Sequence, residues 1–245
     1  MNEAMNEAMN EAVLELRGIG FEHPGVAVID DLDLEVARGD FVVCVGPSGC
    51  GKSTLLALLG GHLRPTRGTI ARRGHSRTIY QDGGLFPWLT VRQHIAQGLP
   101  RDLGPARIAH KIEEWLAVTR LTEFAHHHPH QLSGGMRQRV ELARALAAET
   151  DILLLDEPFA ALDYQTRARM RRELASTLAD RPRTVVLVTH DIDEAVQLGD
   201  RVVVLGPRPA SVRRIIDLPS GRPRSPTDPG VADAAHAVMT ELGLT

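Results

Sequence analysis

Short, continuous apolar runs alternate along the chain with longer segments whose apolar residues recur at helical spacing. The runs are rich in Val, Ile and Leu and lie at Phe41–Val45, Ile152–Leu155, Val185–Val188 and Val202–Leu205, with a further strand-like run at Val212–Asp217. Runs that are apolar at every position are typical of strands buried on both faces of a parallel sheet. The helical patterns lie at Lys52–Leu59, Arg107–Val118, Met136–Ala148, Gln165–Leu178 and Ile192–Leu198. This alternation predicts an α/β fold.

Changes in the pattern divide the chain into predicted regions. Residues 1–12 repeat MNEA three times, and we expect a disordered or helical extension there because chain termini often lack packing. Residues 13–217 carry the alternating pattern and are predicted to form the main domain. Within it, about 83–147 shows helical patterns without a convincing strand, which predicts a helical insertion. Residues 218–245 are predicted to form a proline-rich loop and a short helix near Val231–Leu242.

Composition narrows the class of protein. The chain has 245 residues, of which 43% are hydrophobic and 24% charged, as in a globular protein that buries a core of its own. A balance of 28 basic against 31 acidic residues argues against nucleic acid as a partner. The only cysteines, Cys44 and Cys50, favour a reducing compartment. With no apolar run of the roughly 18 residues that cross a bilayer and no signal-peptide pattern, we expect a soluble cytoplasmic protein.

A glycine-rich segment follows the first apolar run and opens a predicted helix. It matches G-x-x-x-x-G-K-[ST] at every fixed position, and its residues are Gly46, Pro47, Ser48, Gly49, Cys50, Gly51, Lys52 and Ser53. Such glycines let successive backbone N–H groups converge on phosphate at a helix N-terminus. Lys52 is expected to reach the β- and γ-phosphates, and Ser53 to bind Mg²⁺. The alternative, a glycine-rich turn with a surface lysine, is disfavoured because the flanking strand and helix both fit the motif.

Two carboxylates follow the apolar run at Ile152–Leu155. Asp156, at the end of this predicted strand, is suited to hold Mg²⁺ through water, and Glu157 is placed to polarise a water for attack on the γ-phosphate. An Asp-Glu pair after a strand is by itself more often a solvated turn. The phosphate loop elsewhere in the chain is what favours the functional interpretation.

The segment Leu132–Val140 contains a second predicted helix start. Ser133 can cap that helix, and Gly134 and Gly135 allow close backbone approach, so the segment is suited to receive an anion. The plainer interpretation is an N-cap without further function. The segment lies some 20 residues before the acidic strand, and this position favours the anion-binding interpretation.

Together these motifs resemble the nucleotide-binding subunit of ATP-binding cassette (ABC) transporters over about residues 13–217. The matching positions are Gly46–Thr54 for the phosphate loop, Gln81 for the glutamine loop, Leu132–Gln138 for the signature segment, Ile152–Glu157 for the acidic strand, Ala161–Asp163 for the D-loop and His190 for the switch histidine. The resemblance also implies that Phe21 stacks on adenine. For the fold, it implies an α/β P-loop ATPase core with a mixed sheet, an N-terminal antiparallel β subdomain and an inserted helical subdomain.

The resemblance further implies how the site works. Two copies of the chain, or this chain and a homologous ATPase subunit, would close head to tail on two ATP molecules. Each ATP would lie between the phosphate loop, ending at Thr54, of one copy and Ser133, Gly134, Gly135 and Gln138 of the other, with Asp163 nearby. Glu157, His190, Lys52 and Gln81 would form the catalytic set, and Ser53, Gln81 and Asp156 would bind Mg²⁺.

A narrower resemblance is to the importers of nitrate, sulfonates and taurine. It rests on Gln81–Val91, which contains Pro87-Trp88, and on Pro129–Gln131 ahead of the signature segment. It implies separate transmembrane permease subunits, an extracytoplasmic substrate-binding protein and a location at the cytoplasmic face of the inner membrane. An ABC exporter ATPase and a soluble non-transport ABC protein remain alternatives. The span from Gly68 to Gln81 is short for this group, which predicts a shortened antiparallel hairpin.

One further cluster invites a metal-binding interpretation. His126–His130 contains four histidines, and imidazole binds zinc. A loop with no cysteine nearby does not hold ligands in tetrahedral geometry, so we expect a solvated loop here.

Overall fold

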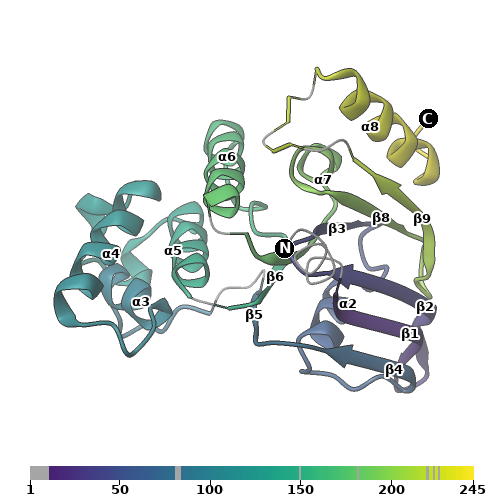
Figure 1. Cartoon of the computed structure of the whole chain (residues 1–245), viewed down its shortest axis with the longest axis horizontal. Coiled ribbons are helices and arrows are strands. Elements are labelled where there is room, and N and C mark those ends of the chain that lie inside the picture. The colour runs from purple at the N-terminus through teal and green to yellow at the C-terminus, as the bar shows by residue number, and fades with distance from the viewer. Residues whose placement is uncertain are drawn as a thin grey trace, which may run out of the picture.

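The computed structural model describes residues 11–80, 84–148, 150–180, 182–218, 221–222, 224–225 and 227–245. Two sheets lie beside one another, and a group of three helices lies apart from them at the opposite end of the molecule (Figure 1). Among the described residues, none of the helices combines the length and the apolar character needed to span a membrane. The predicted extension at residues 1–12 lies almost entirely outside the described residues.

The larger sheet has the strand order β5-β6-β7-β3-β8-β9. Its strands are β3 (Phe41–Val45), β5 (Ser76–Ile79), β6 (Ile152–Asp156), β7 (Thr184–Thr189), β8 (Arg201–Leu205) and β9 (Val212–Asp217). All pairs are parallel except β8–β9, which is antiparallel and makes the sheet mixed. Every residue of β3, β6 and β7 is buried, as their unbroken apolar runs predict.

Separate cores cover the two faces of this sheet. Along β3, Phe41 and Val43 belong to one core and Val42 and Cys44 to the other, because successive side chains of a strand point to opposite faces. Helix α2 (Lys52–Leu59) and the smaller sheet pack on one face. The other face is covered by α6 (Tyr164–Asp180), α7 (Ile192–Leu198) and α8 (Pro229–Glu241). Two buried faces explain why the interior positions of β3, β6 and β7 are apolar, with Asp156, Thr184 and Thr189 at strand ends.

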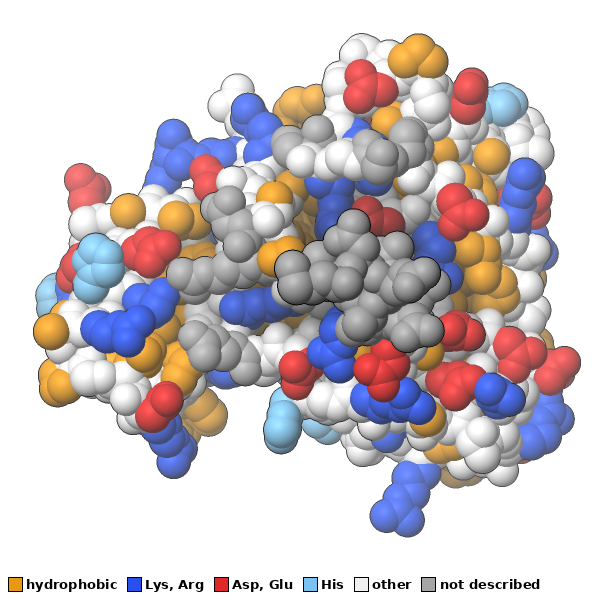
Figure 2. Space-filling model, in the orientation of Figure 1, with side chains coloured by type: hydrophobic (Ala, Val, Ile, Leu, Met, Phe, Trp, Pro, Cys, Tyr) orange, Lys and Arg blue, Asp and Glu red, His pale blue; other side chains and the backbone are white. Residues whose placement is uncertain are grey.

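The smaller sheet is antiparallel with the order β2-β1-β4. Its strands are β1 (Ala12–His23), β2 (Val26–Ala37) and β4 (Arg67–Arg72). Along β2, buried and exposed positions alternate, with Leu32, Leu34 and Val36 facing in and Asp31, Asp33 and Glu35 facing out. Acidic and basic side chains are interspersed over this part of the surface (Figure 2). The sheet is therefore solvated on one side and packed on the other.

A helical lobe is inserted between β5 and β6. It consists of α3 (Val91–Gly98), α4 (Pro105–Val118), two short 3₁₀ helices, η1 (Thr122–Phe124) and η2 (Pro129–Gln131), and α5 (Gly134–Ala147). Ile95, Trp115 and Leu116 are buried between its helices. The sequence pattern did not predict α3.

The shortened hairpin predicted between Gly68 and Gln81 does not form. Strand β4 pairs with β1, and β5 pairs in parallel with β6, so the two strands belong to different sheets. Strand β5 takes its hydrogen-bond partner from β6, while β4 packs so closely against β1 that a Cβ atom at Gly68 would lie 2.4 Å from the carbonyl oxygen of Arg17. The short connection therefore carries the chain from one sheet to the other.

Candidate nucleotide-binding site

The glycine-rich loop connects the end of β3 to the start of α2. Gly49 and Gly51 have φ angles of +76° and +120°, which residues with a side chain rarely adopt. A Cβ atom on Gly51 would also lie 2.9 Å from Cγ1 of Val28, and one on Gly46 would lie 2.9 Å from Sγ of Cys50. The loop is thus packed against β2 as tightly as glycine allows.

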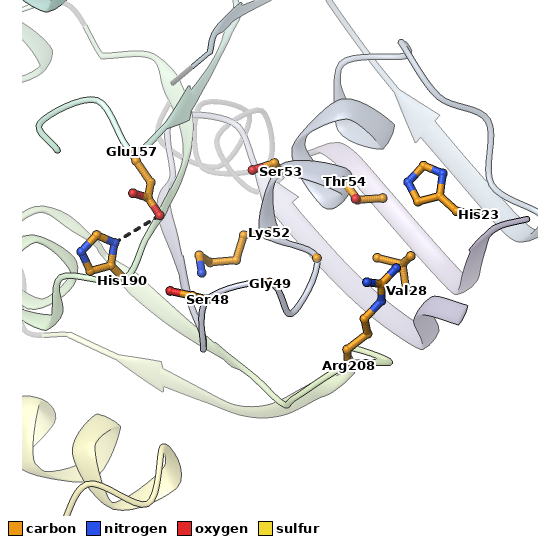
Figure 3. A pocket seen from close by; sticks show the side chains of 11 residues that line it. His23, Val28, Ser48, Gly49, Lys52, Ser53, Thr54, Glu157, His190 and Arg208 are labelled. Atoms are coloured by element: carbon orange, nitrogen blue, oxygen red, sulfur yellow. Dashed lines mark ion pairs between the residues drawn. The ribbon is translucent and has the colours of Figure 1, made fainter. Parts of the chain in front are cut away.

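A cavity of about 590 Å³ opens over this loop, within the range of roughly 300–1,000 Å³ found for small-molecule sites. Its lining consists of His23, Val28, Ser48, Gly49, Gly51, Lys52, Ser53, Thr54, Glu157, His190 and Arg208. Glu157 and His190 lie at one end of the cavity, and His23, Val28 and Arg208 at the other (Figure 3). The cavity therefore brings six residues of the loop together with five residues from five other segments of the chain.

Lys52 is buried, with 6% of its surface exposed. Its Nζ donates hydrogen bonds to the carbonyl oxygens of Gly46, at 2.9 Å, and Pro47, at 3.0 Å. These contacts hold the ammonium group against the loop, where the backbone N–H groups at the start of α2 also converge. A phosphate in the loop would meet a positioned cation and a helix N-terminus together.

Glu157 and His190 form a pair at the far end of the cavity. Oε1 of Glu157 lies 3.2 Å from Nδ1 of His190, with the glutamate side chain largely buried and the histidine exposed. Glu157 follows β6 and has a φ angle of +46°, and its N–H donates to the carbonyl oxygen of Val188 in β7. This unusual backbone geometry, of a kind that is often found at functional sites, turns the carboxylate into the cavity.

Two side chains carry oxygen donors suited to Mg²⁺. Ser53 lines the cavity, and Asp156 is buried at the end of β6. A hydroxyl and a carboxylate are oxygen donors that fit a hard cation bound chiefly through substrate phosphates. The described residues contain no group of three or more His, Cys, Asp and Glu side chains arranged to hold a metal, the His126–His130 run included.

The signature segment lies outside the cavity. Ser133 caps α5, since its Oγ accepts a hydrogen bond from the N–H of Met136 at 3.2 Å, and both Ser133 and Gly134 are exposed. Gln138 does not face the cavity either. Its Nε2 donates to the carbonyl oxygen of Glu157, and its Oε1 accepts from the N–H of Ala161, both at 3.1 Å.

Asp163 has a local structural contact. Its carboxylate accepts a hydrogen bond from the N–H of Thr166 at 3.0 Å, at the start of α6. Hydrogen bonds from Thr166 hold the pKa of Asp163 below its usual value. Gln81 lies outside the described residues, so its role stays a prediction.

The ring at the mouth of the cavity is His23, not Phe21. Phe21 is 7% exposed, belongs to the core beneath the smaller sheet, and is absent from the cavity lining. The rings of Phe21 and His23 meet edge to face with centroids 5.0 Å apart. Phe21 continues the apolar positions of β1, whereas His23 ends the strand directly before Pro24-Gly25. The prediction that Phe21 stacks on adenine is therefore corrected.

Burial shifts the pKa of two groups near the site. It raises the pKa of the Cys50 thiol within the loop, which keeps that side chain an uncharged packing group. Behind His190, burial raises the pKa of Glu194 to about 7. Thr189 Oγ1 donates to Oε2 of Glu194 at 2.7 Å, and the N–H of Asp191 donates to Thr189 Oγ1 at 3.0 Å. The turn that carries His190 is thus built on a buried carboxyl group.

The phosphate loop joins strand β3 to helix α2, and β6, two places away in the same sheet, ends at Asp156 and is followed by Glu157, which pairs with His190. These features define a P-loop ATPase with a cassette architecture. The profile of the ABC transporter family matches residues 29–160. The chain belongs to the ABC transporter family, as its ATP-binding ATPase component, which confirms the family and fold class predicted from the sequence.

Individual relatives support the same assignment. The aliphatic sulfonates import ATP-binding protein SsuB of Bacillus cereus is 38% identical over 225 residues, covering 89% of each chain. A putative ATP-binding protein of Brucella abortus, BruAb2_1123, is 43% identical over 221 residues, or 85% of each. Among solved structures, dimeric MJ0796, a bacterial ABC transporter cassette, is similar with a TM-score of 0.76 and 30% identity, over 85% of this chain and 100% of the other. A post-hydrolysis state of MJ0796 bound to ADP and Pi has a TM-score of 0.75, 29% identity and the same coverage.

Proposed function

We propose that this ATPase powers import of a small anion such as an aliphatic sulfonate. The observation that carries the hydrolytic role is the Glu157–His190 pair, 3.2 Å apart, in one cavity with Lys52. The cargo class is supported by the name of the Bacillus relative and by the Pro87-Trp88 dipeptide. His23, in place of Phe21, is the ring that stacks on adenine.

Each side chain has a defined task in this proposal. Lys52 exchanges its two carbonyl contacts for oxygens of the β- and γ-phosphates. Glu157 takes a proton from a water whose oxygen bonds to the γ-phosphorus while the bond from that phosphorus to the β–γ bridging oxygen breaks, giving ADP and phosphate. His190 binds the γ-phosphate and holds Glu157 in place.

Magnesium binding is part of the same proposal. The hydroxyl of Ser53 and the carboxylate of Asp156 would hold Mg²⁺, with Gln81 as a further contact. The ion neutralises charge on the phosphate oxygens when it is bound.

The signature segment is proposed to act on a second copy of the chain. Ser133, Gly134 and Gly135 stand at an exposed helix start outside the cavity of their own chain, and an exposed helix N-terminus favours anions. Two copies would close head to tail, so that Ser133–Gln138 of each faces the ATP of the other. The remaining partners are separate permease subunits and an extracytoplasmic substrate-binding protein, with this chain at the cytoplasmic face of the inner membrane.

The test uses Glu157→Gln, which removes the base and keeps the shape of the side chain. Co-expressed with candidate permease subunits, this variant is expected to form a dimer with Mg-ATP, measured by size-exclusion light scattering, and to retain the membrane protein. Lys52→Ala is the matched control, in which ATP should produce no dimer. Wild-type turnover in either variant would overturn the assigned chemistry.

The same experiment separates the alternatives. An ATP-dependent dimer that never retains a membrane protein would favour a soluble non-transport ABC protein. Import is tested by sulfonate uptake in cells that carry the whole transporter. Export of the sulfonate in place of uptake would contradict import while leaving the ATPase chemistry intact.

A further inference from the structure

One residue of the cavity comes from a segment that none of the sequence motifs covers. Arg208 lies in the connection between β8 and β9, and this connection is attached to β2. The N–H of Ala210 donates to the carbonyl oxygen of Val28 at 2.8 Å, and the carbonyl oxygen of Ala210 accepts from the N–H of Asp30 at 3.0 Å. These two backbone bonds fix the start of the Arg208 side chain beside the phosphate loop.

The guanidinium group of Arg208 is itself oriented. Its Nε donates to the carbonyl oxygen of Ala27 at 3.2 Å. Among the described residues no carboxylate pairs with it, whereas Arg201, at the start of β8, pairs with Asp40 at 2.6 Å. Arg208 is exposed on the cavity wall. The guanidinium group is thus held at one edge, and its remaining N–H donors and its flat face are open to the cavity. Such a group can bind a ligand there.

The direction of the nucleotide follows from the opposite end of the cavity. Lys52 and the Glu157–His190 pair mark where the terminal phosphate lies, so the base must lie at the end formed by His23, Val28 and Arg208 (Figure 3). We propose that the guanidinium plane of Arg208 packs against the purine base and thereby adds a wall to the nucleoside half of the site. This inference rests on the proposed nucleotide site and assigns a role to a residue outside the family motifs.

Two properties of the contact follow from its physics. A guanidinium group over an aromatic face is attracted by the π-electrons whichever purine is present. Arg208 therefore adds affinity without selecting adenine over guanine. Because the contact is with the base, it is the same before and after the γ-phosphate leaves, and it stabilises substrate and transition state equally.

The experiment compares ligands with and without a base. Dissociation constants for ADP, GDP and pyrophosphate are measured by calorimetry on the full chain, since none of these ligands is hydrolysed at the site. Arg208→Ala is expected to weaken ADP and GDP about 5- to 30-fold alike and to change pyrophosphate binding less than about twofold. Arg208→Lys, which keeps the charge and loses the planar stacking surface, should restore only part of the lost ADP affinity. Arg214→Ala, on exposed β9 outside the cavity, is the control.

Three results would overturn the inference. They are unchanged ADP binding by Arg208→Ala, equal weakening of ADP and pyrophosphate, and full restoration by lysine, the last two of which would indicate a phosphate contact. In steady-state assays of the transporter, KM for ATP should rise while kcat stays within about twofold. A wild-type chain that binds neither ADP nor ATP would instead refute the proposed function, so the two failures are distinguishable.

Discussion

The buried carboxyl group of Glu194 makes the stability of the fold depend on pH in an unusual direction. Burial raises its pKa from 4.5 to about 7, against the effect of the Thr189 hydroxyl, Arg171 and Arg167, while Asp191 raises it further. Between these two pKa values the folded chain binds more protons than the unfolded chain. The contribution of Glu194 to the free energy of unfolding is therefore fully present below pH 4.5, and it is lost as the pH rises toward and through 7.

The magnitude follows from the size of the shift. A change from 4.5 to about 7, at roughly 1.4 kcal/mol per pKa unit, gives a penalty of about 3 kcal/mol once the group is ionised in both states. At pH 5 the same relation gives roughly 0.8 kcal/mol. Glu194→Gln keeps the shape and an acceptor for Thr189 while removing the charge. The variant should therefore gain stability over the wild type by roughly 2–3 kcal/mol more at pH 8 than at pH 5.

Urea unfolding of both proteins at pH 5, 6, 7 and 8 measures this difference, since effects of all other titrating groups cancel between them. Glu114→Gln, at a half-exposed carboxylate on α4, controls for the loss of one negative charge. A gain for Glu194→Gln that is equal at pH 5 and pH 8 would refute the reasoning, because it would mean that the pKa of Glu194 is not raised in the folded chain.

Four further substitutions separate packing from ligand binding. Gly51→Ala should lower stability by about 1–3 kcal/mol and abolish measurable ATP binding, because its Cβ atom meets Val28 at a φ of +120°; thermal unfolding and calorimetry measure both. Phe21→Ala should lower stability by about 3–5 kcal/mol and leave the ATP affinity of the folded protein unchanged. His23→Ala should weaken ATP binding several-fold without loss of stability. The reverse pattern would indicate that Phe21 is the stacking ring. Ser133→Ala should cost about 1 kcal/mol of stability through the lost helix cap and also reduce ATP-driven dimerisation in light scattering; a loss of stability alone would leave Ser133 as a cap only.

The central strands and the phosphate loop could be predicted from the sequence because physical constraints leave few alternatives there. A strand buried on both faces has to be apolar at its interior positions, and Phe41–Val45 has that pattern in the sequence and that burial in the structure. Helix α3 was harder, since Val91–Gly98 has few apolar residues. A usable signal was nevertheless present, because Thr90 and Gln93 form a capping box, T-x-x-Q, at its start.

Other features depend on contacts that a pattern of residues does not contain. The sequence shows that position 138 is a glutamine but not whether its side-chain amide binds a ligand or another part of the chain. Its bonds to Glu157 and Ala161 are seen only once α5 and β6 are placed in the fold. Arg208 enters the cavity from a loop far away in the sequence. Whether Phe21 or His23 faces the cavity depends on where β1 leaves the core. The turn at Pro24-Gly25, directly after His23, marks that point in the sequence.

The side-chain amide of Gln138 has a consequence for communication within the molecule. It is bonded at once to the carbonyl oxygen of the residue that carries the base and to the N–H of Ala161 in the D-loop. Any rotation of the helical lobe about the sheet must therefore stretch both bonds or carry the main chain at Glu157 along with it. Hydrogen exchange at the Ala161 amide therefore measures how often its bond to Gln138 opens. Because Gln138 also bonds the main chain at Glu157, faster exchange is expected when the helical lobe moves relative to the catalytic glutamate.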